Sequence, residues 1–253
     1  MVEPSRPASS TRGCVLGLCP FLMATVAAMT CLTTATFASA AGLNLSWDDC
    51  GAAGVADKDF ACDTNSGTHT LVCSLVAPSN AFGVDGGEGQ LEVRQWNVPF
   101  PSWWDLHNAG SCRETNATLD LTFPGLTACK DSWAGHAIAG SSITSYQVDP
   151  NYSSWRRLYF VIAIPSTNRF DMVEGDEYYV AKIVIDNGKT VGSGSCDGCM
   201  DGVDVGLRLF AIYRYQASSV IIDYPATRNT VTWQGGKVPT LNRTWGSIKV
   251  LYR

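Results

Sequence analysis

Apolar and polar residues alternate with a period of two along much of this chain, as in β-strands that bury one face. In Glu177–Asp186, for example, one face carries Tyr179, Ala181, Ile183 and Ile185, and the opposite face carries Tyr178, Val180, Lys182 and Val184. Beyond residue 40, no stretch sustains the helical period of about 3.6 residues. The strands predicted from this alternation are Gln90–Val98, Trp155–Ile164, Glu177–Asp186, Val203–Tyr215, Ser219–Tyr224, Thr230–Trp233 and Trp245–Tyr252.

Turn-forming residues separate these predicted strands. Asn187-Gly188 and Gly235-Gly236 are the strongest turn signals. The segment Ser102–Asn108 is the main place where a short helical turn is expected. We therefore predict an all-β fold, a single antiparallel β-sandwich that is jelly-roll-like and has short disulfide-closed loops.

The first 40 residues have the pattern of a secretory signal peptide. Arg6 and Arg12 precede an uncharged, largely apolar run over residues 14–38, and the run ends in Ala38-Ser39-Ala40. We expect cleavage after this site, which leaves residues 41–253 as one β-sandwich domain without a membrane span. An uncleaved membrane anchor is the alternative. The expected location is extracellular or at the cell surface, with the periplasm as the alternative.

Composition and charge narrow the functional classes further. The chain is 45% hydrophobic and only 16% charged, which argues against a disordered chain or a coiled coil. Its 18 basic and 23 acidic residues give a formal net charge of −5. A nucleic-acid partner is not expected, because phosphate binding needs a basic face. The expected partner is a polysaccharide or a cell-surface protein.

The cysteines of an exported chain are expected to form disulfides. Three of the ten lie in the signal segment, and the other seven lie beyond residue 40. Pairing of neighbours along the sequence predicts Cys50–Cys62, Cys112–Cys129 and Cys196–Cys199. Cys73, in a strand-like apolar segment, is left as a free thiol. A zinc site at Cys196-Asp-Gly-Cys199 lacks a second ligand pair, so zinc is disfavoured.

The sequence contains no recognisable catalytic motif. It lacks a Gly-x-Ser-x-Gly nucleophile turn, and its acidic residues lie mostly in turns, where no local pattern nominates a glycosidase pair. The three histidines are widely separated: His69, His107 and His136. No catalytic residue and no cofactor are therefore predicted, and an extracellular hydrolase with dispersed acids is kept as an alternative.

One acidic, glycine-containing loop is the best candidate for a cation site. Asp197, Asp201 and Asp204 could supply three oxygen ligands to calcium, although the EF-hand pattern is absent. The competing interpretation is a solvated hairpin loop held by cysteines.

Tryptophan is the most unusual feature of the composition, since all eight lie beyond residue 40. In an extended loop, the adjacent Trp103 and Trp104 cannot both point inward, so one of them is a candidate for an exposed ring that stacks on a sugar. Burial in the sandwich core is the alternative for this pair. For Trp155, Trp233 and Trp245, which lie in predicted strands, the core is favoured.

Several segments resemble an uncharacterised family of secreted proteins from environmental bacteria. They are Asn44-Leu-Ser-Trp-Asp-Asp-Cys50, Ala61-Cys-Asp-Thr-Asn65, Trp103-Trp-Asp-Leu-His-Asn-Ala-Gly-Ser-Cys112, Glu177-Tyr-Tyr179, Lys189-Thr-Val-Gly-Ser-Gly-Ser-Cys-Asp-Gly-Cys199, Thr232-Trp-Gln-Gly-Gly236 and the ending Asn242-Arg-Thr-Trp-Gly-Ser-Ile-Lys-Val-Leu-Tyr-Arg253. The resemblance implies export and a disulfide-containing β fold, with no established activity or ligand. It also implies that relatives carry another small residue in place of Cys73. The shared ending is expected to be either a last sheet strand or a signal read by surface machinery.

Together these observations predict a secreted, non-catalytic surface or extracellular protein with a binding or structural role. A carbohydrate-binding module that uses exposed tryptophan is the first alternative. An assembly subunit that pairs through the edge strand Ile248–Tyr252 is another.

Overall fold

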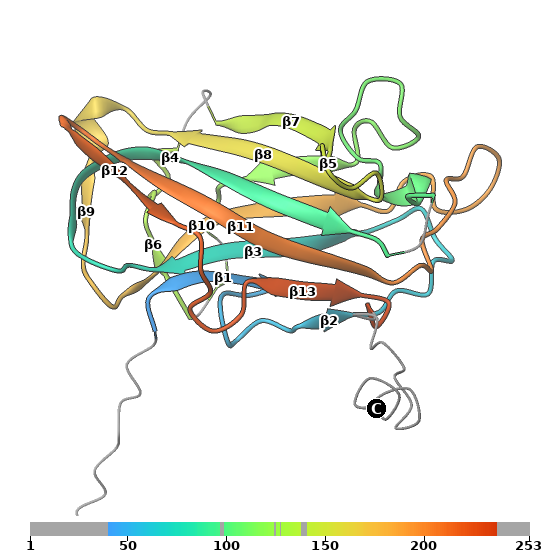
Figure 1. Cartoon of the computed structure of the whole chain (residues 1–253), viewed down its shortest axis with the longest axis horizontal. Coiled ribbons are helices and arrows are strands. Elements are labelled where there is room, and N and C mark those ends of the chain that lie inside the picture. Colours follow the sequence, from blue (N-terminus) through green and yellow to red (C-terminus); the bar gives the residue numbers. More distant parts are fainter. Residues whose placement is uncertain (1–39, 97–98, 124, 127, 138–140, 237–253) are drawn as a thin grey trace, which may run out of the picture. The chain divides into compact units, whose positions relative to one another are not determined.

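Two β-sheets packed face to face form the framework of the described chain (Figure 1). The computed structural model describes residues 40–96, 99–123, 125–126, 128–137 and 141–236. The five-stranded sheet contains β1 (Gly42–Trp47), β3 (Thr68–Val76), β10 (Glu177–Asp186), β5 (Ala117–Asp120) and β6 (Lys130–Asp131). The eight-stranded sheet contains β2 (Asp57–Lys58), β13 (Thr230–Trp233), β11 (Val203–Arg214), β4 (Ala81–Arg94), β8 (Trp155–Ala163), β7 (Ser142–Val148), β12 (Ala217–Ile222) and β9 (Phe170–Met172). The predicted all-β sandwich is thus confirmed.

Strand pairing is antiparallel throughout the long strands of both sheets. Within the described residues, only the two-residue strands β2 and β6 pair in parallel, with β13 and β10 respectively. Two single 3₁₀ turns, η1 (Ser102–Trp104) and η2 (Ser166–Asn168), interrupt the loops. The first of them falls inside the segment where a helical turn was predicted.

The core lies between the sheets and is filled by aromatic and branched side chains. On β10, all residues from Tyr178 to Ile183 are buried, and so is Ile185. Lys182 is buried with them and forms an ion pair with Asp120 at 2.9 Å. Most of β10 is therefore covered on both faces, which the alternation in the sequence did not indicate.

Two phenylalanines of the core pack directly on bare glycines of β4. A Cβ atom at Gly87 would lie 2.4 Å from the ring of Phe210, and one at Gly89 would lie 2.1 Å from the ring of Phe160. Any side chain there would displace a ring that is completely buried. The glycines of β4 are therefore packing positions inside a strand rather than turn positions.

The three disulfides differ from the predicted set. The predicted pairs Cys50–Cys62, Cys112–Cys129 and Cys196–Cys199 are wrong. The structure instead joins Cys50 to Cys129, Cys62 to Cys199 and Cys112 to Cys196, across sequence separations of 79, 137 and 84 residues. The loops that meet in space come from distant parts of the chain, because the sheet order does not follow the chain order. The disulfides therefore tie remote segments together and do not close short loops.

Cys73 lies in β3, where it is buried and has no disulfide partner. Its surroundings are apolar, and this burial raises the pKa of the thiol to about 12. A thiol held neutral in this way behaves as a small core residue.

The two ends of the chain lie outside the described residues. These ends include the predicted signal segment up to residue 39 and the shared ending, with Trp245 and the predicted strand Trp245–Tyr252. Among the described residues, no helix is long and apolar enough to span a membrane.

Candidate functional site

The Trp103–Trp104 pair is not an exposed platform, which corrects the sequence prediction. Both side chains are completely buried, and their rings contact each other at a centroid distance of 5.2 Å. Trp103 also stacks on Trp233 at 5.1 Å and donates from Nε1 to Thr190 Oγ1 at 3.0 Å. The prediction failed because it assumed extended backbone, whereas the pair lies in the turn η1, where neighbouring side chains can point to the same side.

A buried arginine holds this turn against a neighbouring loop. The Arg113 guanidinium lies 3.7 Å from the ring centroid of Trp103. It donates to the carbonyl oxygens of Trp103 at 2.7 Å, Gly188 at 3.1 Å and Asp186. Burial lowers the pKa of Arg113 to about 10, and the charge of Asp186 partly offsets this effect. The surroundings of Trp103 are therefore those of a structural residue.

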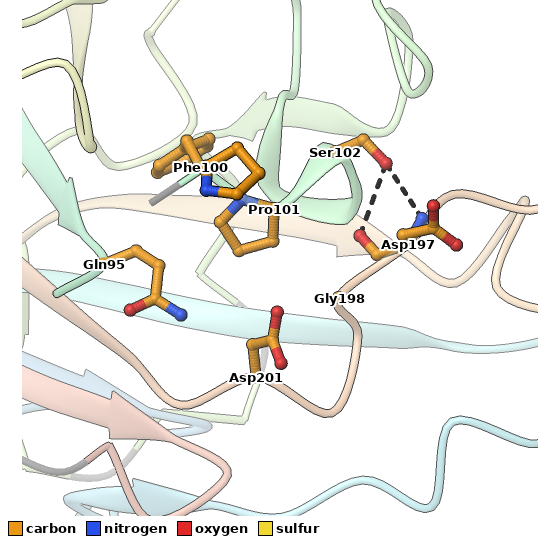
Figure 2. A pocket seen from close by; sticks show the side chains of 8 residues that line it. Gln95, Phe100, Pro101, Ser102, Asp197, Gly198 and Asp201 are labelled. Carbon is orange, nitrogen blue, oxygen red and sulfur yellow. Dashed lines mark hydrogen bonds between the residues drawn. The ribbon is translucent and has the colours of Figure 1, made fainter. Parts of the chain in front are cut away.

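The three aspartates proposed as calcium ligands do not converge. Asp197 and Asp201 line an open groove of about 390 Å³ beside η1 (Figure 2). The groove is bounded by Gln95, Pro99, Phe100, Pro101, Ser102, Asp197, Gly198 and Asp201. Figure 2 shows the Asp197 carboxylate pointing away from Asp201. Asp204 is buried on β11 instead, and there it accepts a hydrogen bond from Trp96 Nε1 at 3.2 Å.

Burial raises the pKa of Asp204. Asp197 and Asp201 are exposed. Within the described part of the chain, no three His, Cys, Asp or Glu side chains lie close enough together to hold a metal ion. Calcium binding by Asp197 and Asp201 stays a prediction.

A different set of aromatic rings reaches the surface, and we call Trp96, Tyr152 and Trp155 the aromatic patch. Trp96 is 44% exposed and Tyr152 is 52% exposed, while Trp155 is half-buried. Trp155 stacks on Tyr152 with centroids 4.1 Å apart and meets Trp96 edge to face at 5.9 Å. Trp155 thus lies at the surface, although its strand position predicted the core, whereas the core prediction for Trp233 is confirmed.

Neighbouring strands hold the aromatic patch in place. Trp96 follows the end of β4, and Trp155 opens β8 opposite Arg94 of β4. The turn before β8 is fixed by Asp149 Oδ1, which accepts the backbone N–H of residue 151 at 2.8 Å and that of Tyr152 at 3.2 Å. Trp155 is therefore attached to a strand, whereas Trp96 and Tyr152 lie in the segments that adjoin β4 and β8.

A cluster of charges lies next to the aromatic patch on the same sheet. Glu92 of β4 accepts from Arg94 Nη2 at 2.9 Å and from Arg208 Nε at 3.0 Å, and Arg157 Nε lies 3.7 Å away. Arg157 Nε also lies 2.6 Å from Asp149 Oδ2. We call Arg94, Arg157 and Arg208 the arginine row. The guanidinium of Arg94 joins the row to the patch, because it lies 4.7 Å from the ring centroid of Trp155.

The histidines do not form a catalytic group with these residues. His69 is buried between Phe60 and Trp233, with ring centroids at 4.8 and 4.7 Å. Burial lowers its pKa, and the nearby charge of Lys58 lowers it further. His107 is half-buried and His136 is exposed, and each lies in a loop.

Sequence reasoning missed the aromatic patch and the arginine row. A usable signal was present, since Arg94 and Trp96 end one predicted strand while Trp155 and Arg157 begin another. What the sequence did not contain was the pairing of these two strands, which places all four side chains at one end of one sheet.

No family model matches the chain, and no curated protein does. Among solved structures it is similar to a type II cohesin domain from the cellulosome of Acetivibrio cellulolyticus, with a TM-score of 0.36 and 9% identity over 78% of this chain and 96% of that one. It is also similar to a cohesin module from a Clostridium perfringens family 33 glycoside hydrolase, with a TM-score of 0.29 and 12% identity over 73% and 96% of the two chains. At these scores neither likeness assigns the chain to a family or indicates a ligand.

Proposed function

We propose that this chain is a secreted, non-catalytic module that binds polysaccharide through the aromatic patch. The observation that carries this proposal is the group of three contacting aromatic rings at the surface, beside the ends of β4 and β8. Three disulfides among the described residues support a location in an oxidising compartment outside the cytosol.

Exposed aromatic rings are costly to leave in water and often mark a contact surface. A sugar ring can cover such a ring, because its C–H groups form a flat apolar face while its hydroxyls remain outside. The Trp96 ring is held by its hydrogen bond to Asp204, and the Tyr152 ring is held by stacking on Trp155. Rings that are already fixed lose little conformational entropy when a ligand binds.

The surroundings of the acidic residues support a binding role rather than hydrolysis. A glycosidase needs two carboxyl groups facing each other across the scissile bond. Beside the aromatic patch, Glu92 and Asp149 are both engaged by arginines instead. The exposed acids Asp197 and Asp201 lie in the neighbouring groove, where the Asp197 carboxylate points away from its neighbour.

The proposal is tested by retention of the secreted protein on a panel of insoluble polysaccharides and by affinity electrophoresis in soluble ones. The double variant Trp96→Ala/Tyr152→Ala is expected to lose retention while its melting temperature changes little. Phe82→Ala is the matched control, because Phe82 is an exposed aromatic residue at the opposite end of β4, with 64% of its surface accessible. Retention that survives in the double variant, or no retention of the wild type on any polymer, would refute the proposal.

A further inference from the structure

The arginine row is built by the pairing of three adjacent strands. Glu92 of β4 lies opposite Arg157 of β8 on one side and opposite Gly206 of β11 on the other. Cross-strand partners share a face of the sheet, so these positions form one line across it. Arg94, two residues along β4, projects from the same face and reaches Glu92.

The third guanidinium enters this line through a local irregularity of β11. The β4–β11 ladder shifts between Leu207 and Leu209, so Arg208 is the extra residue of a bulge. A Cβ atom at Gly206 would lie 2.8 Å from Arg208 Nη2, so the missing side chain leaves the space that the guanidinium occupies. The bulge and the glycine together therefore direct Arg208 onto Glu92, as bulges often redirect a side chain toward a site.

Within this cluster the acidic side chains are less exposed to solvent than the arginine side chains. The side chain of Glu92 is 10% exposed and that of Asp149 is 0% exposed. The side chains of the arginine row are more accessible, at 19% for Arg94, 27% for Arg157 and 26% for Arg208. Counting formal charges gives three arginines against Glu92, Asp149 and Asp204, which accepts from Trp96, so the group is neutral in total and its positive charges are the more accessible ones. The outer layer of this face is therefore cationic.

Arg208 contacts Glu92 through Nε, so its terminal Nη groups are not used in that contact. Arg157 contacts Asp149 through Nε and also hydrogen-bonds the side chain of Tyr159. Planar guanidinium groups bind carboxylates and sulfates through paired N–H donors, and these are strong, directional hydrogen bonds. We infer that the aromatic patch and the arginine row form one site for an anionic polysaccharide, whose sugar ring stacks on the patch while its carboxylate or sulfate binds the row. This inference rests on the proposed function and specifies the ligand class of that site.

The first test compares matched polymers that differ only in charge. Wild-type secreted protein is assayed on polygalacturonate and on its methyl ester, and on dextran sulfate and dextran. In at least one pair, we expect the charged polymer to bind about tenfold more tightly than the neutral one. A tenfold ratio in affinity corresponds to one charge-assisted hydrogen bond. Added sodium chloride should weaken only this charged binding, since exposed charges are screened by salt. Equal affinity within both pairs, or no binding to any of the four, would overturn the inference.

The second test uses Arg208→Gln, in which Arg94 and Arg157 still neutralise Glu92. This variant should weaken binding to the charged polymer and leave any binding to its neutral partner unchanged. Arg214→Gln on the same strand is the control, since Arg214 donates to the Ser218 carbonyl instead. An unchanged affinity of Arg208→Gln for the charged polymer would contradict the inference.

The two proposals fail in different ways. The protein could bind charged and neutral polymers equally and lose both activities in Trp96→Ala/Tyr152→Ala. That result would support the aromatic patch as a polysaccharide site and overturn the inference of an anionic ligand. Binding of the charged polymer could instead depend on Arg208 and persist in the double variant. That result would show that the aromatic patch is not part of the binding site.

Discussion

The molecule contains two aromatic clusters of similar composition and opposite surroundings. The buried cluster consists of Trp47, Phe60, His69, Trp103, Trp104 and Trp233. Its tryptophans are completely buried, whereas the aromatic patch leaves about half of Trp96 and Tyr152 in contact with water. Tryptophan content alone therefore does not identify a ligand surface, because the same residue type serves both clusters.

The polar ends of the indole rings distinguish the two clusters. In the buried cluster, Trp47 Nε1 donates to the Thr232 carbonyl at 2.9 Å, and Trp233 Nε1 donates to the Cys199 carbonyl at 2.7 Å. Trp103 Nε1 donates to the Thr190 hydroxyl at 3.0 Å, and Trp104 Nε1 has no hydrogen-bond partner among the described residues. The buried indoles therefore use neutral acceptors or none. Trp96 donates instead to a carboxylate, Asp204, beside a cationic surface. The first arrangement stabilises the fold, and the second orients a ring for contact.

Replacing Trp233 with alanine should destabilise the fold more than any other substitution in either cluster. Its ring contacts five others in the buried cluster, with centroid distances from 4.7 to 5.8 Å. Loss of a large buried ring leaves a cavity, and we expect a loss of about 3–5 kcal/mol in the free energy of unfolding. Urea denaturation followed by circular dichroism measures this loss.

Trp96→Ala in the aromatic patch is the comparison for that variant. A half-exposed ring leaves little cavity, so we expect a loss of about 1 kcal/mol or less. Similar losses for Trp96→Ala and Trp233→Ala would show that the two clusters contribute equally to the fold, which would remove the distinction drawn above.

Removal of the Cys62–Cys199 disulfide should have the next largest effect. This bond links residues 137 apart in the sequence, and the Cys199 carbonyl accepts the hydrogen bond of Trp233 in the buried cluster. Replacing both cysteines with alanine should lower the free energy of unfolding by about 2–5 kcal/mol, because the unfolded chain gains conformational freedom.

Cys73→Ala is the matched control for the disulfide variant, since it removes a buried sulfur without removing a cross-link. If Cys73→Ala were as destabilising as loss of the disulfide, packing rather than cross-linking would explain the effect.

Much of the fold could be predicted from the alternation of apolar residues, and the failures have specific causes. The first half of β4 was missed because its glycines interrupt the alternation of apolar and polar side chains, whereas Gly87 and Gly89 leave room for Phe210 and Phe160. The disulfide pairs were missed because sequence proximity does not reveal which loops the sheet order brings together. Local patterns thus predicted strands, and long-range pairing decided the connections.

The candidate site was less accessible to sequence reasoning than the fold. Trp103 and Trp104 drew attention because they are adjacent, yet the turn η1 buries both. The rings that do reach the surface are about 60 residues apart in the sequence and meet only because β4 pairs with β8. Predicting a site whose residues come from different strands requires the register of strand pairing. Composition and sequence spacing do not contain that information.

The smallest predicted effect concerns the pH dependence contributed by His69 in the buried cluster. Burial lowers the pKa of His69 in the folded state below its ordinary value of 6.5. The unfolded chain therefore binds a proton more readily, so this contribution to stability is fully present above pH 6.5 and is lost as the pH falls through the lower, folded-state pKa.

His69→Gln cannot be protonated, so it should remove this contribution to the pH dependence even if it lowers stability overall. The measurement is the free energy of unfolding of wild type and variant from neutral to mildly acidic pH, taken as a difference at each pH. That difference cancels the titration of the other acids and bases and isolates His69. We expect it to shrink as the pH falls below 6.5, whereas a constant difference would mean that the buried cluster tolerates a charged imidazole.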